Sequence, residues 1–358
     1  MGRDRARRPL ALTMGDPAGI GPEITLRAWL ARTTRTIPPF AVFADPADIE
    51  RRAAGLGIAV ETAIVASPVD AMTVFDTRLP IIAVPLAEPS RAGKPSHSNA
   101  SAIIASIDRS VAAVAASDAS AIVTCPIAKS VLYGAGFQHP GHTEYLAHLA
   151  RLHWGGDEPR PVMMLAGGGL RVVPLTIHVP LQDVPRLVTT DLVVQTCLIL
   201  AAALRADFGI PAPRIAVAGL NPHAGEGGAI GREDADVIAP AVSRLTAMGL
   251  DISGPHPADT MFHAAARGRY DAAVAMYHDQ ALIPIKTLAF DTGVNVTLGL
   301  PFVRTSPDHG TAFDIATKGV ASAESLIAAL QMAADMCRHR AAHVTAPRAQ
   351  APPQWSQP

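Results

Sequence analysis

The chain has 358 residues, which is enough for two ordinary domains and a large core. Hydrophobic residues make up 49% of it and charged residues 17%, so a largely disordered protein is excluded. The 30 Lys and Arg nearly cancel the 31 Asp and Glu, and the formal charge of -1 gives no electrostatic reason to expect nucleic acid or an anionic membrane as partner.

Short apolar runs alternate with longer amphipathic segments along the chain. We predict strands at 10–13, 40–44, 81–84, 121–124, 161–166, 171–176, 214–220, 272–278 and 294–299. We predict helices from Pro22 and over 99–117, 188–208, 232–248 and 322–340. The alternation indicates an α/β protein with a mostly parallel sheet, arranged as two α/β lobes around a central cleft.

The cysteines and the termini indicate where the protein works. Its three cysteines form no CxxC pair and no disulfide framework, which favours a reducing cytoplasm (Cys125, Cys197 and Cys337). No apolar run reaches the ~18 residues that a membrane span needs. The basic start "MGRDRARRP" lacks the apolar region of a signal peptide and is interpreted as a loose tail.

Two glycine-rich loops lie at strand ends. "GDPAGIGPE" at 15–23 follows a strand and precedes a helix, so its amides can face an anion. It has neither the dinucleotide fingerprint nor a P-loop, and a tight strand–helix turn is the favoured reading. "LAGGGLRVV" at 165–173 joins two strand-like runs and predicts a hairpin.

Three histidines stand at the exits of apolar strands, namely His178, His223 and His278. Three imidazoles with an open position make a catalytic site for zinc or a similar ion. Separate polar or capping roles are the alternative, because the three are far apart in sequence. Asp259 and Asp279 are candidate carboxylates behind the ligands, although Asp259 also suits a helix N-cap.

A second set of residues is cationic and polar. Lys286, Asn295 and Arg304 stand at separate element ends, and His142 and Thr143 open a helix in "PGHTEYL". Each alone is more often a solvated or capping residue. Together they offer a lysine, an arginine, an amide and a helix start, which suit a phosphorylated substrate.

Several segments stand in collinear order between about residue 10 and about residue 335: "MGDPAGIGPEI", "PGHTEYLA", "NPHAGEGG", "ADTMF", "YDAAVAMYHDQ" and "GVNVTLGLPFVRTSPDHGTAFDIA". Together they resemble the 4-hydroxythreonine-4-phosphate dehydrogenase family of vitamin B6 biosynthesis. The resemblance implies NAD-dependent oxidation of 4-phosphohydroxy-L-threonine at C3, followed by decarboxylation to 3-amino-2-oxopropyl phosphate. It also implies a homodimer, a divalent metal, and a fold similar to the isocitrate and isopropylmalate dehydrogenases.

The resemblance also implies roles for single residues. His178, His223 and His278 match the metal ligands, with zinc expected first and magnesium or cobalt as alternatives. Because the family shares these ligands between subunits, His278 is expected to complete its partner's site. The substrate-binding positions are matched by His142, Thr143, Lys286, Asn295 and Arg304.

The stretch "HGTAFDIATKG" looks like the adenosine-binding loop of the isopropylmalate dehydrogenases. This likeness implies that NAD, or NADP as an alternative, contacts His309, Gly310, Thr311 and Asp314. The candidate catalytic residues are Asp259, Asp279 and Lys286. The proton acceptor is one of these two aspartates or a metal-bound water, and the sequence does not decide between them.

The chain departs from the family pattern in two places. Cys125 and Ala128 stand where a glycine and a histidine are expected, and 153–161 looks like a small insertion. Neither touches the metal or cation set, so the reaction class is kept. A dehydrogenase of a related acid phosphate such as threonate 4-phosphate is the alternative, and a metal-dependent phosphatase is a remoter one.

The domain prediction places residues 1–128 and 300–341 in a first lobe. Residues 129–299 form a second lobe with the metal and the dimer interface. The last residues, 342–358, are rich in Pro and Gln and are predicted to be disordered.

Overall fold

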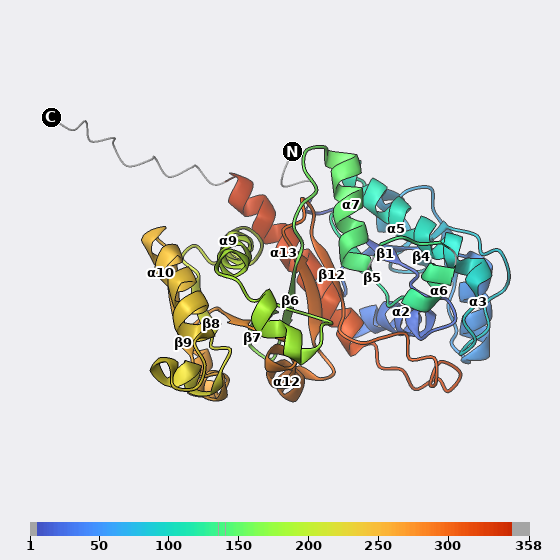
Figure 1. The fold of residues 1–358 in the computed structure, drawn as a ribbon. Coiled ribbons are helices and arrows are strands. Elements are labelled where there is room, and N and C mark those ends of the chain that lie inside the picture. Colours follow the sequence, from blue (N-terminus) through green and yellow to red (C-terminus); the bar gives the residue numbers. More distant parts are fainter. Residues whose placement is uncertain (1–5, 135, 140, 346–358) are drawn as a thin grey trace.

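A computed structural model describes residues 6–134, 136–139 and 141–345 of the chain (Figure 1). One twelve-stranded sheet runs through the molecule in the order β3-β4-β2-β1-β5-β12-β11-β6-β7-β10-β8-β9. The strands are β1 (Leu10–Thr13), β2 (Phe40–Ala44), β3 (Thr62–Ile64), β4 (Leu79–Ala83), β5 (Ile122–Thr124), β6 (Val162–Gly167), β7 (Leu170–Pro174), β8 (Arg214–Ala218), β9 (Asp251–His256), β10 (Ala272–Ala275), β11 (Val294–Leu298) and β12 (Arg304–Pro307).

Helices alternate with these strands. The α-helices are α2 (Gly21–Leu30), α3 (Pro46–Gly55), α4 (Ala71–Val74), α5 (Ala100–Ala115), α6 (Lys129–Gly134), α7 (His142–Trp154), α8 (Val184–Leu187), α9 (Thr190–Asp207), α10 (Ala239–Ala247), α11 (Ala264–Arg267), α12 (His278–Ala289) and α13 (Glu324–Thr345). Shorter 3₁₀ or π turns are η1 (Ala31–Thr33), η2 (Pro68–Asp70), η3 (His97–Asn99), η4 (Leu181–Asp183), η5 (Pro222–Gly228), η6 (Asp234–Ile238) and η7 (Ala258–Thr260).

The sheet has two parallel wings joined by an antiparallel centre. Strands β3, β4, β2, β1, β5 and β12 pair in parallel, and so do β7, β10, β8 and β9. Between the wings, β12–β11, β11–β6 and β6–β7 are antiparallel. Strands such as β1 and β10 are buried along their whole length, as expected for parallel strands covered on both faces.

Helices of both wings cover the sheet (Figure 1). The long helix α13 contacts β12 and β11 at the centre, α2 of the first wing and α9 of the second. Helix α7 packs on α5 of the first wing, although it follows the predicted lobe boundary at 128. The apolar core is therefore continuous from one wing to the other.

Most predicted elements are confirmed, including the α/β class and the mostly parallel sheet. The hairpin between β6 and β7 is confirmed too, with Gly168 and Gly169 both in the left-handed region. Strand ends near the histidines differ from the prediction. The strand before His178 ends at Pro174, and the strand before His278 ends at Ala275, so that His278 opens helix α12.

The C-terminal prediction is wrong for four residues, because α13 continues through 342–345. The rest of that tail and residues 1–5 lie outside the described residues. In the described part of the chain, no single helix is long and apolar enough to cross a membrane. One pair, Leu181–Leu187 with Thr190–Asp207, passes on length and composition only and is bent by 87°.

Candidate active site

Parallel strands deliver their following loops to the same edge of a sheet. On the first wing, the loops after β1 and β5 meet, and Asp16 N donates to Pro126 O at 2.8 Å. On the second wing, β7, β10 and β8 are neighbours, and the residues after them carry His178, His278 and His223. The three histidines therefore follow strands that neighbour one another in the sheet, and a metal shared by all three stays a prediction.

Arg304 opens β12 at the centre of the sheet and is 4% exposed. Its Nη2 donates to Thr124 Oγ1 at 2.7 Å and its Nη1 to Thr297 Oγ1 at 2.9 Å. Burial lowers the pKa of this guanidinium to about 10. A buried cation held by hydroxyls alone lacks a counter-charge, which makes it a strong binding group for an anion.

His142 and Lys129 lie beside this arginine. His142 opens α7, and its Nε2 is buried with no hydrogen-bond partner among the described residues. Burial, then the charges of Arg304 and Lys129, lower the pKa of His142 to about 3, so the ring is neutral near pH 7. Its Nε2 is therefore free to bind a ligand. We call Arg304, His142 and Lys129 the cation cluster.

Sequence reasoning missed Lys129, since "PIAKS" carries no spacing signal. It opens α6 in the segment that departs from the family pattern at Ala128. A Cβ on Gly141 would lie 3.3 Å from Lys129 Nζ, so the glycine leaves room for the ammonium group. Its charge also helps to lower the pKa of His178, after burial and before His278. Lys129 thus lies close enough to influence both predicted residue sets.

The other predicted substrate-binding residues do not all lie beside Arg304 and His142. Thr143 is half-buried in the first turn of α7. Asn295 is half-buried on β11, in register with Ser306 of β12. Lys286 is engaged elsewhere, because its Nζ donates to Asp308 O at 2.6 Å and pairs with the Asp308 carboxylate at 2.7 Å. This bond joins α12 to the segment that leads into the predicted cofactor loop.

His178 and His278 form a pair, with ring centroids 5.7 Å apart. Together with Thr176, Tyr277 and Asp279 they line a cavity of about 330 Å³. His278 Nδ1 hydrogen-bonds Asp279 Oδ1 at 2.6 Å, the arrangement that orients a ligating imidazole.

His223 is exposed on η5 and does not join this pair within one chain. In the described part of the chain, no group of three His, Cys, Asp or Glu is placed to hold a metal. His178 and His223 both have left-handed backbones, with φ of 54° and 51°, which is uncommon for residues other than glycine. Such conformations often mark functional sites. We call His178, His223 and His278 the histidine edge.

The two candidate carboxylates differ in setting. Asp279 lies in the first turn of α12 beside His278, where the positive end of the helix favours a carboxylate. Asp259 is exposed inside η7. The alternative of an N-cap for Asp259 is wrong, since Pro257 stands at the cap position and makes no side-chain cap bond.

The predicted cofactor loop packs on the glycine loop that follows β1. Ile20 N donates to Thr311 O at 3.0 Å, and a Cβ on Gly19 would lie 2.8 Å from that oxygen. His309 Nδ1 hydrogen-bonds Gly310 O at 3.0 Å, and Asp314 is exposed. The loop therefore stands at the end of β1, on the first wing.

Known proteins resemble this chain along nearly all of its length. The family model described as "Pyridoxal phosphate biosynthetic protein PdxA" matches residues 36–333. A 4-hydroxythreonine-4-phosphate dehydrogenase from Methylorubrum populi is 58% identical over 94% of this chain and 97% of its own. Another from Bradyrhizobium diazoefficiens is 54% identical over 93% and 98%.

Solved structures agree with these sequences. The crystal structure of 4-hydroxythreonine-4-phosphate dehydrogenase from Klebsiella pneumoniae is 38% identical, covers 92% of this chain and 99% of its own, and superposes with a TM-score of 0.81. The sequence comparisons and the structure comparison identify the same family, and the chain belongs to the pyridoxal phosphate biosynthetic protein PdxA family.

Proposed function

We propose that this chain is a cytoplasmic NAD-dependent dehydrogenase of 4-phosphohydroxy-L-threonine. It oxidises the C3 hydroxyl to a ketone, and the resulting β-keto acid loses CO₂ to give 3-amino-2-oxopropyl phosphate. The observation that carries the substrate assignment is the cation cluster, since a buried guanidinium without a carboxylate partner sits beside a neutral histidine and a lysine. The names of the relatives support the same substrate.

The cation cluster suits the phosphate of this substrate. Arg304 offers a planar fork with two hydrogen-bonded corners already fixed by threonines, so little side-chain entropy is lost on binding. The neutral His142 adds a donor, and Lys129 adds a charge. Binding the phosphate away from the reacting carbon fixes C3 in place, which speeds the reaction as well as strengthening binding.

The chemistry at C3 needs one hydride and one proton to leave. The hydride passes to the nicotinamide, and the hydroxyl proton passes to a base. Asp279 is the better placed of the two predicted carboxylates, because it lies with the histidine pair in one cavity whereas Asp259 is exposed on η7. The C–C bond to the carboxylate then breaks, and its electrons form an enol that is reprotonated at C2.

A divalent metal fits the histidine edge in part. His178 and His278 offer two imidazoles on one cavity, and Asp279 supports one of them. One chain supplies no third ligand there among the described residues. We propose that His223 of another chain completes the set, and zinc is the first candidate, with magnesium or cobalt next. Such an ion supplies Lewis-acid polarisation of the hydroxyl when bound.

A homodimer would bring that third ligand. Exposed apolar side chains line the cavity of the histidine pair: Leu181 is 68% exposed and Val179 is 38% exposed. Ile283, on the same helix as His278, is 65% exposed. Exposed apolar residues gathered at one place are typical of an interface. The pairing of His178 with His278 in one chain supports His223, rather than the expected His278, as the ligand that crosses.

The test is turnover of 4-phosphohydroxythreonine and threonate 4-phosphate, side by side, with NAD and with added zinc, magnesium or cobalt after chelation. Absorbance at the NADH band should rise fastest with the first substrate. Faster turnover of threonate 4-phosphate would support a dehydrogenase but contradict the assigned substrate. Release of inorganic phosphate without formation of NADH would show a phosphatase and contradict the dehydrogenase assignment.

A further inference from the structure

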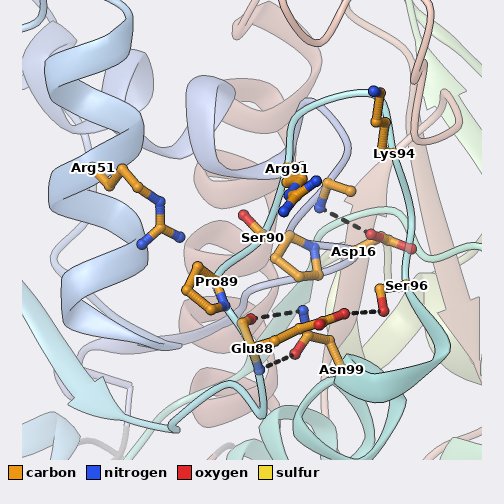
Figure 2. A pocket seen from close by; sticks show the side chains of 11 residues that line it. Asp16, Arg51, Glu88, Pro89, Ser90, Arg91, Lys94, Ser96 and Asn99 are labelled. Carbon is orange, nitrogen blue, oxygen red and sulfur yellow. Dashed lines mark hydrogen bonds between the residues drawn. The ribbon is translucent and has the colours of Figure 1, made fainter.

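A cavity of about 560 Å³ lies on the first wing, next to the glycine loop that follows β1 (Figure 2). Its volume falls within the ~300–1,000 Å³ of small-molecule sites. Figure 2 shows three cations around it, Arg51, Arg91 and Lys94, with two acids, Asp16 and Glu88. The lining thus has an excess of positive charge.

The floor of the cavity is rigid. Asn99 is 2% exposed, and its side chain bonds the backbone of Glu88 in both directions, at 3.2 Å to N and 3.1 Å to O. Asp48 accepts from both N and Oγ of Ser90 and also holds Arg51. The loop from 88 to 99 is therefore fixed before any ligand arrives.

Asp16 is the unusual group of this lining. It is 1% exposed, and its Oδ1 accepts from Ala18 N at 3.0 Å. Its other oxygen, Oδ2, is buried without a hydrogen-bond partner among the described residues. A buried carboxylate oxygen without a donor is costly, and a ligand hydroxyl that donates to it would remove that cost.

The cavity lies between the predicted cofactor loop and the cation cluster. On one side, Gly93 N donates to Ala18 O at 2.8 Å, and a Cβ on Gly93 would lie 3.0 Å from Phe313 O. On the other side, Asp16 N donates to Pro126 O, two residues beyond the Thr124 that holds Arg304. Strands β2 and β5 flank β1, so the chain order reverses beside this edge, where α/β sheets bind ligands.

A second, smaller cavity of about 280 Å³ adjoins it. The two share Arg51 and Ser90, and the smaller one is lined by apolar Leu56 and Ala92 and by Ala316 of the cofactor-loop segment. Its lining also includes the polar or charged Asp48, Arg52 and Thr317. A small cavity of mixed lining suits an adenosine, which has apolar ring faces and polar edges, and the cationic cavity that joins it at Arg51 suits a sugar phosphate.

We propose that Arg51, Arg91 and Lys94 hold the diphosphate of the dinucleotide and that Asp16 accepts a hydroxyl of its nicotinamide-side ribose. This places adenosine in the smaller cavity and directs the nicotinamide toward the cation cluster. The inference rests on the proposed function for the identity of the ligand. It adds to the residues of the predicted cofactor loop a set of binding residues that are far from the loop in sequence but adjoin it in space.

The experiment titrates the full-length protein with NADH, followed by fluorescence in the absence of substrate. ADP-ribose and ADP then compete with NADH. Arg91→Gln with Lys94→Gln should raise the Kd for all three ligands by about tenfold or more, as expected for lost charged hydrogen bonds. Asp16→Asn should raise the Kd for ADP-ribose by about tenfold and leave that for ADP unchanged, because ADP lacks the second ribose.

Arg7→Gln with Arg78→Gln is the matched control. It removes two exposed positive charges that do not line the cavity, and its Kd values should equal those of the wild type. Both cavity cations are exposed, so their replacement leaves the core intact even where the buried Asp16 variant folds poorly.

The outcomes separate this inference from the proposed function. If the wild type turns over the phosphorylated substrate and the cavity variants bind NADH as tightly as the wild type, the site assignment is overturned and the function stands. If the variants lose NADH while neither four-carbon substrate is oxidised, the site stands and the function falls. Absence of NADH binding by the wild type overturns the site.

Discussion

The cation cluster and the histidine edge differ in how complete they are within one chain. Arg304 lies on a central strand, is almost wholly buried, and has its hydroxyl partners in place. The histidine edge lies on loops and a helix start, and it brings together only His178 and His278. The proposed phosphate site is thus complete within one chain at the centre of the sheet, whereas the proposed metal site needs a ligand from outside the histidine pair.

This difference reflects the cost of burying charge. A guanidinium can remain buried without a carboxylate only where rigid strands hold its hydrogen-bond partners, as Thr124 and Thr297 do here. Metal-ligating histidines need no such burial, since the ion itself organises them.

The largest effect is expected at the histidine edge. His178→Ala, His223→Ala and His278→Ala should each lose turnover by about a thousandfold or more, with metal content measured by elemental analysis. Mixing His178→Ala with His223→Ala subunits should restore about a quarter of wild-type activity, because random exchange makes half of the dimers hybrid with one intact site each.

A mixture of His178→Ala and His278→Ala is the matched control for that exchange. Both ligands come from the same chain in the structure, so each hybrid site lacks one of them. Recovery in this mixture instead of the other would mean that His278 crosses the interface, as the family resemblance implies.

Arg304→Met should have the next largest effect. Loss of about 3 kcal/mol of charged hydrogen bonding to the phosphate should lower kcat/KM by roughly two orders of magnitude. The free energy of unfolding should stay the same or rise, because the variant removes a buried charge. An unchanged KM for the phosphorylated substrate would exclude Arg304 from the phosphate site.

Lys129→Gln should weaken substrate binding by about tenfold, less than the arginine because the lysine contributes charge without a fixed fork. The effect should shrink as salt is added, which steady-state kinetics at several ionic strengths would measure. Arg78→Gln, an exposed residue outside both the cluster and the cofactor loop, is the control. Equal KM values for the two variants would remove Lys129 from the site.

The smallest effect concerns the pH dependence of stability. The pKa of His142 is about 3 in the folded chain, below its ordinary value near 6.5, so between these values the unfolded chain binds the extra proton. The free energy of unfolding should therefore fall as pH drops from about 6.5 toward 3. His142→Gln should show a shallower fall in urea titrations, and an unchanged slope would contradict the buried, cation-facing setting.

Apolar patterns in the sequence predict the fold well, and the polar strands are where they fail. Strands such as β1 and β10 are unbroken apolar runs and were predicted. Strand β12 reads "RTSP" and looks like a loop, yet it is fully buried, because its neighbours β11 and β5 satisfy its polar groups. Strand β9 contains a glycine and a proline and lies at the sheet edge, where both are tolerated.

Site residues were predictable only where strand ends or family motifs marked them. His178, His223 and His278 follow apolar strands that neighbour one another in the sheet, but their joint role as metal ligands stays a prediction. Lys129 carries no such mark, since its role comes from its charge near His142, which also lies near Arg304. Asp16 lies in a quoted motif, but its role comes from its burial and from the loop after β5 that contacts it. Distance in space between remote segments is the information that a single sequence lacks.

The antiparallel ladders at the middle of the sheet restrict how the molecule moves. Because β12, β11 and β6 join the wings by continuous backbone hydrogen bonds, the wings cannot swing about a free linker. Any approach of the histidine edge to the first wing must instead be a twist shared among these strands, stiff enough that both halves move together by small angles.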